Sequence, residues 1–223
     1  MPPSGVISWG RGAEPMARGG FISVEGTEGA GKTGAVAVIS DWLKASGRSV
    51  VTTREPGGTE VGEELRAVLL GHRDGGMSAE AEVLLMFAAR AEHLERVIRP
   101  ALAAGRWVVC DRFTDASIAY QGCGRGLGMA RVSALGDWLH ADLAPDLTLW
   151  LDLPVRLGLR RAAGRSRPDR FESEQARFFE AVRAGYAGLA RDHGQRIQRI
   201  DASLTQPAVH AAIEAALEER FGR

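Results

Sequence analysis

The sequence has little of several features that mark particular classes of protein. Only two of its 223 residues are cysteine (Cys110 and Cys123), which predicts no disulfide framework and favours the cytoplasm. Neither charge is in excess, because 28 basic residues balance 28 acidic ones, and this argues against nucleic acid as a main partner. No apolar run approaches the length that spans a bilayer, so we expect no membrane partner. An ordinary composition remains, in a chain long enough for one α/β domain.

One stretch carries the strongest functional signal. Residues 26–33 read Gly-Thr-Glu-Gly-Ala-Gly-Lys-Thr and match G-x-x-x-x-G-K-[ST] at every fixed position, between a predicted strand (21–25) and a predicted helix (32–45). The glycines let successive N–H groups point into one concavity, and the helix N-terminus favours an anion there. We expect this loop to bind the phosphates of a nucleotide, with Lys32 at the outer phosphates and the Thr33 hydroxyl on Mg²⁺. The loop residues are Gly26, Thr27, Glu28, Gly29, Ala30, Gly31, Lys32 and Thr33.

Strands and helices alternate along the rest of the chain. Strands are predicted at residues 21–25, 49–53, 107–110, 147–153 and 196–200. Helices are predicted at residues 32–45, 60–70, 78–104, 132–141, 154–162, 172–191 and 206–221. This alternation predicts a three-layer α/β domain over residues 21–223, with a five-stranded parallel sheet flanked by helices. Residues 1–20 lack the apolar core of a secretory signal, so we expect a disordered extension or a start at Met16.

Three further segments are candidates for ligand contact. Residues 54–59 (Arg-Glu-Pro-Gly-Gly-Thr) follow a strand, and they form either a plain turn or a ligand-contact loop. Asp111 ends an apolar strand, which after a P-loop indicates an acid linked to Mg²⁺, although a simple strand end has the same pattern. Residues 113–126 mix Tyr, Gln and Arg with glycine, which suits a polar pocket.

Arginines are concentrated near residue 165. Six of them lie between positions 156 and 170 against one acid, and Gly164, Ser166 and Pro168 interrupt the run. A solvated helix face is the ordinary explanation, but a basic lid over the bound phosphates, at about residues 163–171, agrees with the P-loop. The five histidines show no metal-ligand spacing, and we expect them at the surface or in packing.

Several stretches together resemble the thymidylate (dTMP) kinases. They are residues 26–33, 54–59, 87–90, 111–113, 119–122 and 167–172, in the order that this family has. The resemblance covers nearly the whole chain after Gly20. It implies a P-loop kinase fold and the reaction ATP + dTMP → ADP + dTDP, with ATP and Mg²⁺ required. It also implies a homodimer formed by helix packing.

The resemblance also implies roles for individual residues. Arg112 matches the arginine that binds the acceptor phosphate, and Lys32 acts on the donor phosphates. Phe87 matches the aromatic that stacks on thymine, and Arg90 the residue that hydrogen-bonds the base. Ser117 and Gln121 match positions beside the base, and Tyr120 matches the residue that crowds the 2′ position of the sugar. Glu55 and Asp111 are implied near the phosphates and the metal. The loop lacks arginine, so the lid supplies the transition-state cation, as in the bacterial type, from among Arg165, Arg167 and Arg170.

The chain departs from the family pattern at two positions. Gly34 stands where Thr is common, and Cys123 interrupts a run that is commonly all glycine. Neither change removes a group that the chemistry needs. The alternatives are a P-loop kinase for another nucleoside monophosphate or small alcohol, and a nucleotide-binding protein with little turnover. A GTPase-type switch would need an Asn-Lys-x-Asp motif, and the sequence has none.

Overall fold

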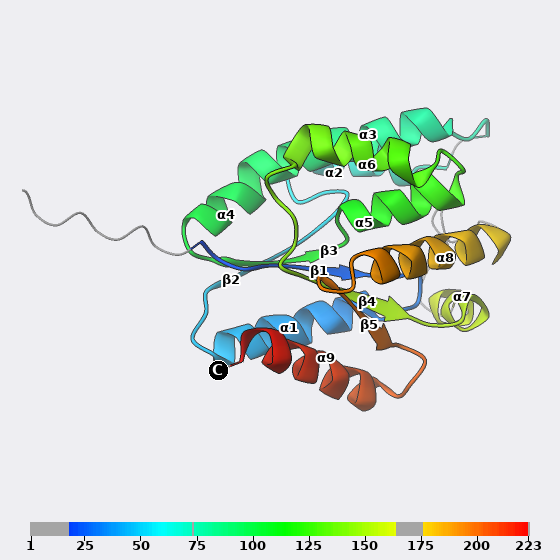
Figure 1. Ribbon diagram of the computed structural model, residues 1–223. Helices are drawn as coiled ribbons and strands as arrows, with labels where there is room; N and C mark the ends of the chain where they lie inside the picture. The colour runs from blue at the N-terminus through cyan, green and yellow to red at the C-terminus, as the bar shows by residue number, and fades with distance from the viewer. Residues whose placement is uncertain (1–17, 73, 164–175, 223) are drawn as a thin grey trace, which may run out of the picture.

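The computed structural model describes residues 18–72, 74–163 and 176–222, and within them five parallel strands form one sheet between two layers of helices (Figure 1). The strand order is β2-β3-β1-β4-β5. The strands are β1 (Phe21–Glu25), β2 (Val50–Arg54), β3 (Trp107–Asp111), β4 (Leu147–Asp152) and β5 (Ile197–Asp201). Each begins within one residue of its predicted start. The predicted three-layer fold with a five-stranded parallel sheet is confirmed.

The central strand positions the phosphate-binding loop. All five residues of β1 are buried, and β1 pairs with β3 on one side and β4 on the other. Ser23 of β1 is the polar exception in its interior, and its hydroxyl bonds Thr148 of β4 at 2.8 Å. Because all strands are parallel, the loops after β1, β2 and β3 leave the sheet at the same edge, where α/β proteins bind ligands.

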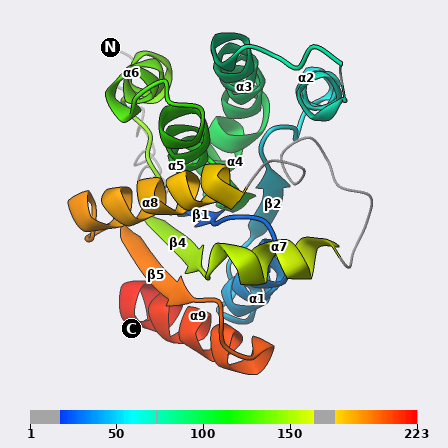
Figure 2. The same cartoon turned by 90° about the vertical axis from the view of Figure 1, so that its right-hand side faces the viewer.

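Helices cover both faces of the sheet (Figures 1 and 2). Helices α1 and α9 pack on one face, where Ile39, Leu43 and Ile213 join the core beneath β1 and β4. The opposite face carries α3, η2, α6 and α8, with η1 and α4 over β3. The helices before β4 are α1 (Lys32–Ala45), α2 (Glu60–Leu70), α3 (Ala79–His93), η1 (Leu94–Ile98), α4 (Arg99–Ala103), α5 (Thr114–Ser117), η2 (Ile118–Gly124) and α6 (Met129–His140). Those after β4 are α7 (Val155–Ala163), α8 (Ala176–Asp192) and α9 (Gln206–Phe221).

Three segments differ from the prediction. The long helix expected at residues 78–104 is built from α3, η1 and α4 in succession, and its wide π-helical turn precedes Pro100, which has no N–H to donate. The polar stretch after Phe113 is helical as α5 and η2. Arg18 and Gly19, assigned to the extension, contact the domain, since Arg18 pairs with Asp146 and Gly19 N donates to Leu102 O.

Candidate active site

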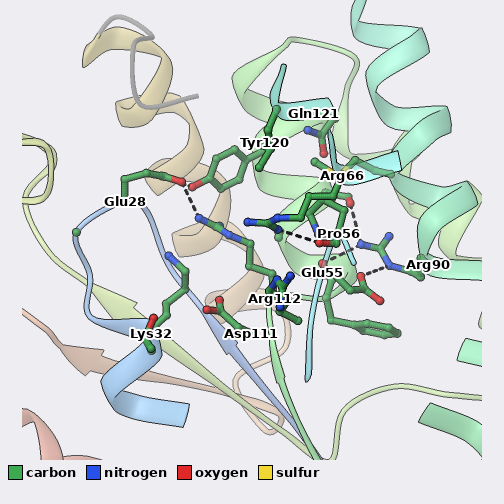
Figure 3. Close-up of a pocket in the computed structure, with 18 of the residues that line it drawn as sticks. Glu28, Lys32, Glu55, Pro56, Arg66, Arg90, Asp111, Arg112, Tyr120 and Gln121 are labelled. Atoms are coloured by element: carbon green, nitrogen blue, oxygen red, sulfur yellow. Dashed lines mark hydrogen bonds and ion pairs between the residues drawn. The ribbon is translucent and has the colours of Figure 1, made fainter. Parts of the chain in front are cut away.

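A cavity of about 310 Å³ lies at the edge of the sheet where β1, β2 and β3 end (Figure 3). Lys32, Asp111 and Arg112 lie toward one end of it, and Arg90 and Gln121 toward the other. The cavity is lined by Glu28, Gly29, Gly31, Lys32, Thr33, Arg54, Glu55, Pro56, Arg66, Leu70, Met86, Arg90, Asp111, Arg112, Phe113, Ala116, Ser117, Tyr120 and Gln121. The structure therefore brings together the predicted residues of the P-loop, the loop after β2, α3 and η2.

The P-loop is held by close backbone contact with α7. Gly29 has φ 74°, and a Cβ there would lie 2.1 Å from Gly158 O. A Cβ on Gly158 would in turn lie 2.4 Å from Glu28 O, so both positions require glycine. Lys32 Nζ donates to the carbonyls of Gly26 at 3.2 Å and Thr27 at 3.1 Å. Burial, and then repulsion from Arg112, lowers the pKa of Lys32 from its ordinary value.

Arg112 connects the P-loop to η2. Its backbone adopts φ 72°, which is uncommon outside glycine. Its Nη1 donates to Gly26 O at 3.0 Å, and its Nη2 to Glu28 Oε1 at 2.8 Å. The guanidinium carbon lies 4.7 Å from the centre of the Tyr120 ring. Burial raises the pKa of Tyr120 well above its usual value, so the phenol keeps its proton and donates it to Glu28 Oε2 at 2.6 Å.

Arg90 is fixed in place by four residues. Its Nε donates to Glu55 Oε2 at 2.7 Å, and its Nη2 donates to Phe113 O at 3.1 Å and Ser117 Oγ at 3.0 Å. The ring of Phe87 lies 4.6 Å from its guanidinium carbon. Burial alone would raise the pKa of Glu55, but the charge of Arg90 and the hydrogen bond with His93 lower it, so Glu55 is ionised.

Three buried polar atoms of cavity residues meet no hydrogen-bond partner within the described chain. They are Arg90 Nη1, Gln121 Oε1 and Asp111 Oδ1. Gln121 Nε2 donates to Glu82 Oε1 at 2.8 Å, which leaves the amide oxygen as an acceptor. Buried polar atoms without partners are rare, and each therefore indicates where a ligand or ion would bind. The donor and the acceptor belong to residues at one end of the cavity, and the carboxylate oxygen belongs to a residue at the other end.

The contacts of two predicted residues, Phe87 and Glu55, do not test their implied roles, which remain predictions. Phe87 does not line the cavity but packs in the core beneath Arg90, which fits the plain interpretation as a core residue. Met86 lines the cavity instead, because one residue along a helix turns a side chain by about 100°. The carboxylate of Glu55 is bound to Arg90 and His93 rather than turned toward Lys32. Arg165, Arg167 and Arg170 lie outside the described residues.

Sequence reasoning missed several cavity residues. Arg66 and Leu70 come from α2, whose amphipathic pattern gave no sign of a ligand contact. Arg66 Nη1 donates to Pro56 O at 2.8 Å, so α2 holds the loop after β2 against the cavity. A basic residue on a helix that follows a proline–glycine loop was the available signal, but it is common on solvated faces.

A second cavity, of about 440 Å³, lies on the other side of the P-loop. It is lined by P-loop residues including Ala30 and Gly31, by Gly34 of α1, and by residues around the start of α9 such as His210. Arg161 of α7 also lines it and donates to Ala202 O at 2.7 Å. The two cavities share Gly29 and Gly31, so the P-loop stands between them.

The fold and the loop define an α/β P-loop protein. A polar cavity lies beside its phosphate-binding loop. Comparison with known proteins narrows the class. The sequence model of the family described as thymidylate kinase matches residues 24–213. A thymidylate kinase of Alkalilimnicola ehrlichii is 57% identical over 209 residues, which cover 93% of this chain and 96% of the relative. One of Teredinibacter turnerae is 52% identical over 200 residues, covering 90% and 98%.

A solved structure agrees with the sequence comparisons. The crystal structure of thymidylate kinase from Ehrlichia chaffeensis superposes with a TM-score of 0.73 at 30% identity, covering 90% of this chain and 99% of that one. This chain belongs to the thymidylate kinase family. No helix in the described part of the chain is long and apolar enough to cross a membrane.

Proposed function

We propose that this chain transfers the γ-phosphoryl group of ATP to the 5′-phosphate of dTMP, giving ADP and dTDP on the route to dTTP. The observation that carries the proposal is one cavity that joins the P-loop to a wall formed by Arg90 and Gln121, which hold one donor and one acceptor without partners in the described chain. Membership of the thymidylate kinase family supports the choice of substrates.

The base end of the cavity matches the edge of thymine. Thymine presents a carbonyl oxygen, O4, and a ring N–H, N3, side by side. Arg90 Nη1 offers N–H donors and Gln121 Oε1 an acceptor, and both are buried without a partner among the described residues. A site with such groups loses binding free energy when the ligand leaves them unpaired. Met86 lines this part of the cavity and supplies apolar contact, while the resemblance assigns stacking on thymine to Phe87.

The middle of the cavity suits the sugar and the acceptor phosphate. Arg112 bonds Glu28 and Gly26 O, and a phosphate would take the place of the Glu28 carboxylate at the same guanidinium. The Tyr120 ring packs against that guanidinium and limits the space beside a bound sugar, in line with its implied selection of deoxyribose.

The donor phosphates would lie in the P-loop, with Lys32 at their outer end. The second cavity, between α7 and the start of α9, is the place for the rest of ATP because it adjoins Gly29 and Gly31. A Mg²⁺ ion fits the residues present, since Asp111 Oδ1 is buried without a partner in the described chain and Thr33 lines the same cavity. When bound, Mg²⁺ neutralises charge on the donor phosphates.

The chain's own residues have one main task in the reaction, which is to bring two polyanions together. The acceptor phosphate is already ionised near neutral pH, because its second pKa is about 6, so no general base is needed. Arg112 holds the acceptor oxygen in line with the bond that breaks. Lys32 stabilises the negative charge that develops on the donor's bridging oxygen. The resemblance assigns a further cation to Arg165, Arg167 or Arg170.

A homodimer is part of the proposal. Trp138 of α6 is 81% exposed and Leu84 of α3 is 59% exposed, and α3 and α6 pack on the same face of the sheet. Large apolar side chains left open to solvent on two neighbouring helices favour contact with a second copy of the chain. Light scattering of the wild type and Trp138→Lys distinguishes a dimer from a monomer. The free cysteines and the use of ATP favour the cytoplasm.

The test is transfer of labelled phosphate from γ-labelled ATP to dTMP, with dTDP identified by chromatography. We expect label in dTDP with the wild type and a loss of at least about 100-fold with Lys32→Ala. Transfer of label to another nucleoside monophosphate and not to dTMP would agree with a kinase but refute dTMP as the acceptor. ATP binding without transfer to any acceptor would indicate a nucleotide-binding protein with little turnover.

A further inference from the structure

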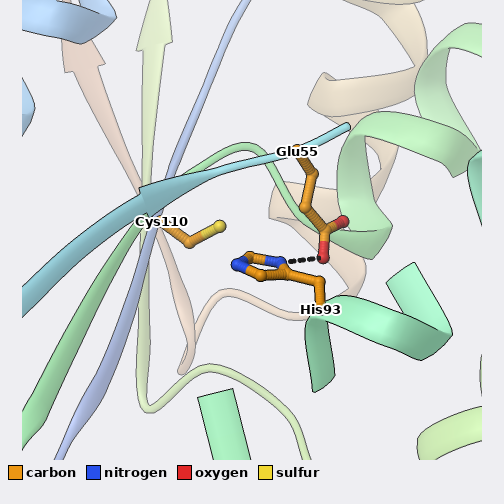
Figure 4. A group of neighbouring side chains, drawn as sticks. All are labelled: Glu55, His93 and Cys110. Atoms are coloured by element: carbon orange, nitrogen blue, oxygen red, sulfur yellow. Dashed lines mark hydrogen bonds and ion pairs between the residues drawn. The ribbon is translucent and has the colours of Figure 1, made fainter. Parts of the chain in front are cut away.

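Glu55, His93 and Cys110 form a buried cluster (Figure 4), and of these three Glu55 also lines the cavity. His93 is fully buried and sits at the end of α3. Its Nδ1 lies 3.0 Å from Glu55 Oε1, and its Nε2 lies 2.6 Å from Thr53 Oγ1. No step of the proposed reaction uses the imidazole, so its burial and its two bonds need another explanation.

The cluster has the composition of a metal site but not the chemistry of one. One ligand atom from each of the three residues lies within 4.8 Å of the others. However, Glu55 already neutralises Arg90, with 2.7 Å between Oε2 and Nε. Burial raises the pKa of the Cys110 thiol well above its usual value, and the sulfur bonds Arg112 O, so it stays protonated. The three groups are therefore engaged with protein partners: His93 bonds Glu55, Glu55 bonds Arg90, and Cys110 bonds Arg112 O.

The direction of these bonds follows from Glu55. An ionised carboxylate only accepts, so Nδ1 of His93 must carry the proton that it shares with Oε1. The other ring nitrogen, Nε2, bonds the Thr53 hydroxyl. The result is a chain of bonds from Thr53 on β2 through His93 and Glu55 to Arg90. Each oxygen of the Glu55 carboxylate has one fixed partner, and the group cannot rotate without breaking one of them.

The loop after β2 closes over the imidazole. A Cβ on Gly58 would lie 2.7 Å from both Cδ2 and Nε2 of His93, so the backbone of this loop passes directly against the ring. The Arg90 guanidinium, at the other end of the chain of bonds, gives Nε to Glu55 and Nη2 to Phe113 O and Ser117 Oγ. Arg90 lines the cavity, and its Nη1 is buried without a partner in the described chain.

The geometry points to His93 as a positioning residue for the acceptor base. It holds the Glu55 carboxylate in the orientation that fixes the Arg90 guanidinium at the wall of the cavity, and this assignment rests on the proposed function. His93 touches neither substrate nor P-loop, so its effect falls on binding of dTMP and not on ATP or the transfer step. A purely structural histidine would instead affect stability and all kinetic constants together.

The test uses three variants that change one bond at a time. His93→Leu removes both ring nitrogens, whereas His93→Asn keeps an N–H donor near the place of Nδ1. Thr53→Val removes only the far hydroxyl and keeps its volume. For each, KM for dTMP, KM for ATP and kcat are measured, together with dTMP binding by calorimetry and the midpoint of thermal unfolding.

We expect His93→Leu to weaken dTMP binding about tenfold, the scale of one hydrogen bond to a charged group, while KM for ATP changes by less than about twofold. His93→Asn should recover most of that loss, and Thr53→Val should have an intermediate effect. Equal losses in His93→Leu and His93→Asn, or a parallel rise in both KM values, would assign His93 a structural role and overturn the inference. Should His93→Leu not fold, His93→Asn and Thr53→Val are compared with the wild type. Weaker dTMP binding with an unchanged KM for ATP in these variants supports the inference, and unchanged dTMP binding in both overturns it.

The wild type separates this inference from the proposed function. A wild type that phosphorylates dTMP, with variants whose dTMP affinity is unchanged, refutes the role of His93 alone. A wild type that does not bind or phosphorylate dTMP refutes the proposed function and, with it, the positioning role.

Discussion

Replacing Glu25 by glutamine should stabilise the protein at alkaline pH and have little effect at acidic pH. Glu25 ends β1 beneath the P-loop and is fully buried. Phe113 N donates to its Oε1 at 2.7 Å, and Tyr186 OH donates to its Oε2 at 2.8 Å. Burial, and then the nearby charge of Asp115, raises the pKa of this carboxyl from 4.5 to about 8. Folding at neutral pH therefore requires Glu25 to take up a proton.

The sign and size of the effect follow from that shift. Because the folded pKa is raised, the stabilisation is fully present below pH 4.5 and is lost as the pH rises through about 8. Each tenfold change in proton affinity corresponds to about 1.4 kcal/mol, so the whole loss comes to roughly 5 kcal/mol. Glutamine has the shape of the protonated acid and does not titrate. Glu25→Gln should match the wild type at acidic pH and exceed it by several kcal/mol at alkaline pH.

The assay is reversible urea unfolding of both proteins at about pH 5, pH 7 and pH 8.5, with the difference in unfolding free energy plotted against pH. Taking the difference cancels every other titrating group. Glu214→Gln, the same chemical change on the exposed side of α9, is the matched control and should give a flat line. A flat line for Glu25→Gln as well, or a variant less stable than the wild type at pH 8.5, would mean that folding does not raise the pKa of Glu25 and would refute the reasoning.

Three further substitutions test the packing around the site. Gly158→Ala places a Cβ 2.4 Å from Glu28 O, so the P-loop must move, and KM for ATP should rise about tenfold or more in steady-state kinetics. Gly185→Ala places a Cβ 2.9 Å from Cys123 Sγ, and calorimetry should show a loss of roughly 1–3 kcal/mol of stability with KM for both substrates unchanged. Met86→Ala removes apolar contact in the cavity and should raise KM for dTMP several-fold without altering KM for ATP, whereas an unchanged value would remove this residue from the base site.

The fold could be predicted almost completely from the sequence. Strand and helix periodicities are local properties, and the right-handed crossover rule leaves few arrangements for alternating elements. No helix or strand was predicted for the stretch after Phe113, which mixes glycines with polar side chains. It forms η2 because α8 packs against it, with Gly185 allowing Cys123 to approach. Such tertiary packing overrides local propensity and is not visible in a single sequence.

The candidate site was predictable in its phosphate half and less so in its base half. The P-loop motif encodes its own backbone geometry, and five of its predicted residues (Glu28, Gly29, Gly31, Lys32 and Thr33) line the cavity. The base half depends on which helical side chain points into the cavity, and the choice between Phe87 and Met86 turns on a single residue. The partnership of Glu55 with His93 joins residues 38 positions apart, and no spacing rule connects them.

The most direct test of the account is a competition among acceptors in one reaction. Equal concentrations of dTMP, dCMP, UMP, AMP and GMP are given to the wild type with limiting ATP, and the diphosphates formed are separated and counted. The account predicts dTDP as the main product, and it predicts that Gln121→Leu loses this preference because the acceptor for the base N–H is gone. A main product other than dTDP, or a preference for dTMP that Gln121→Leu retains in full, would contradict it.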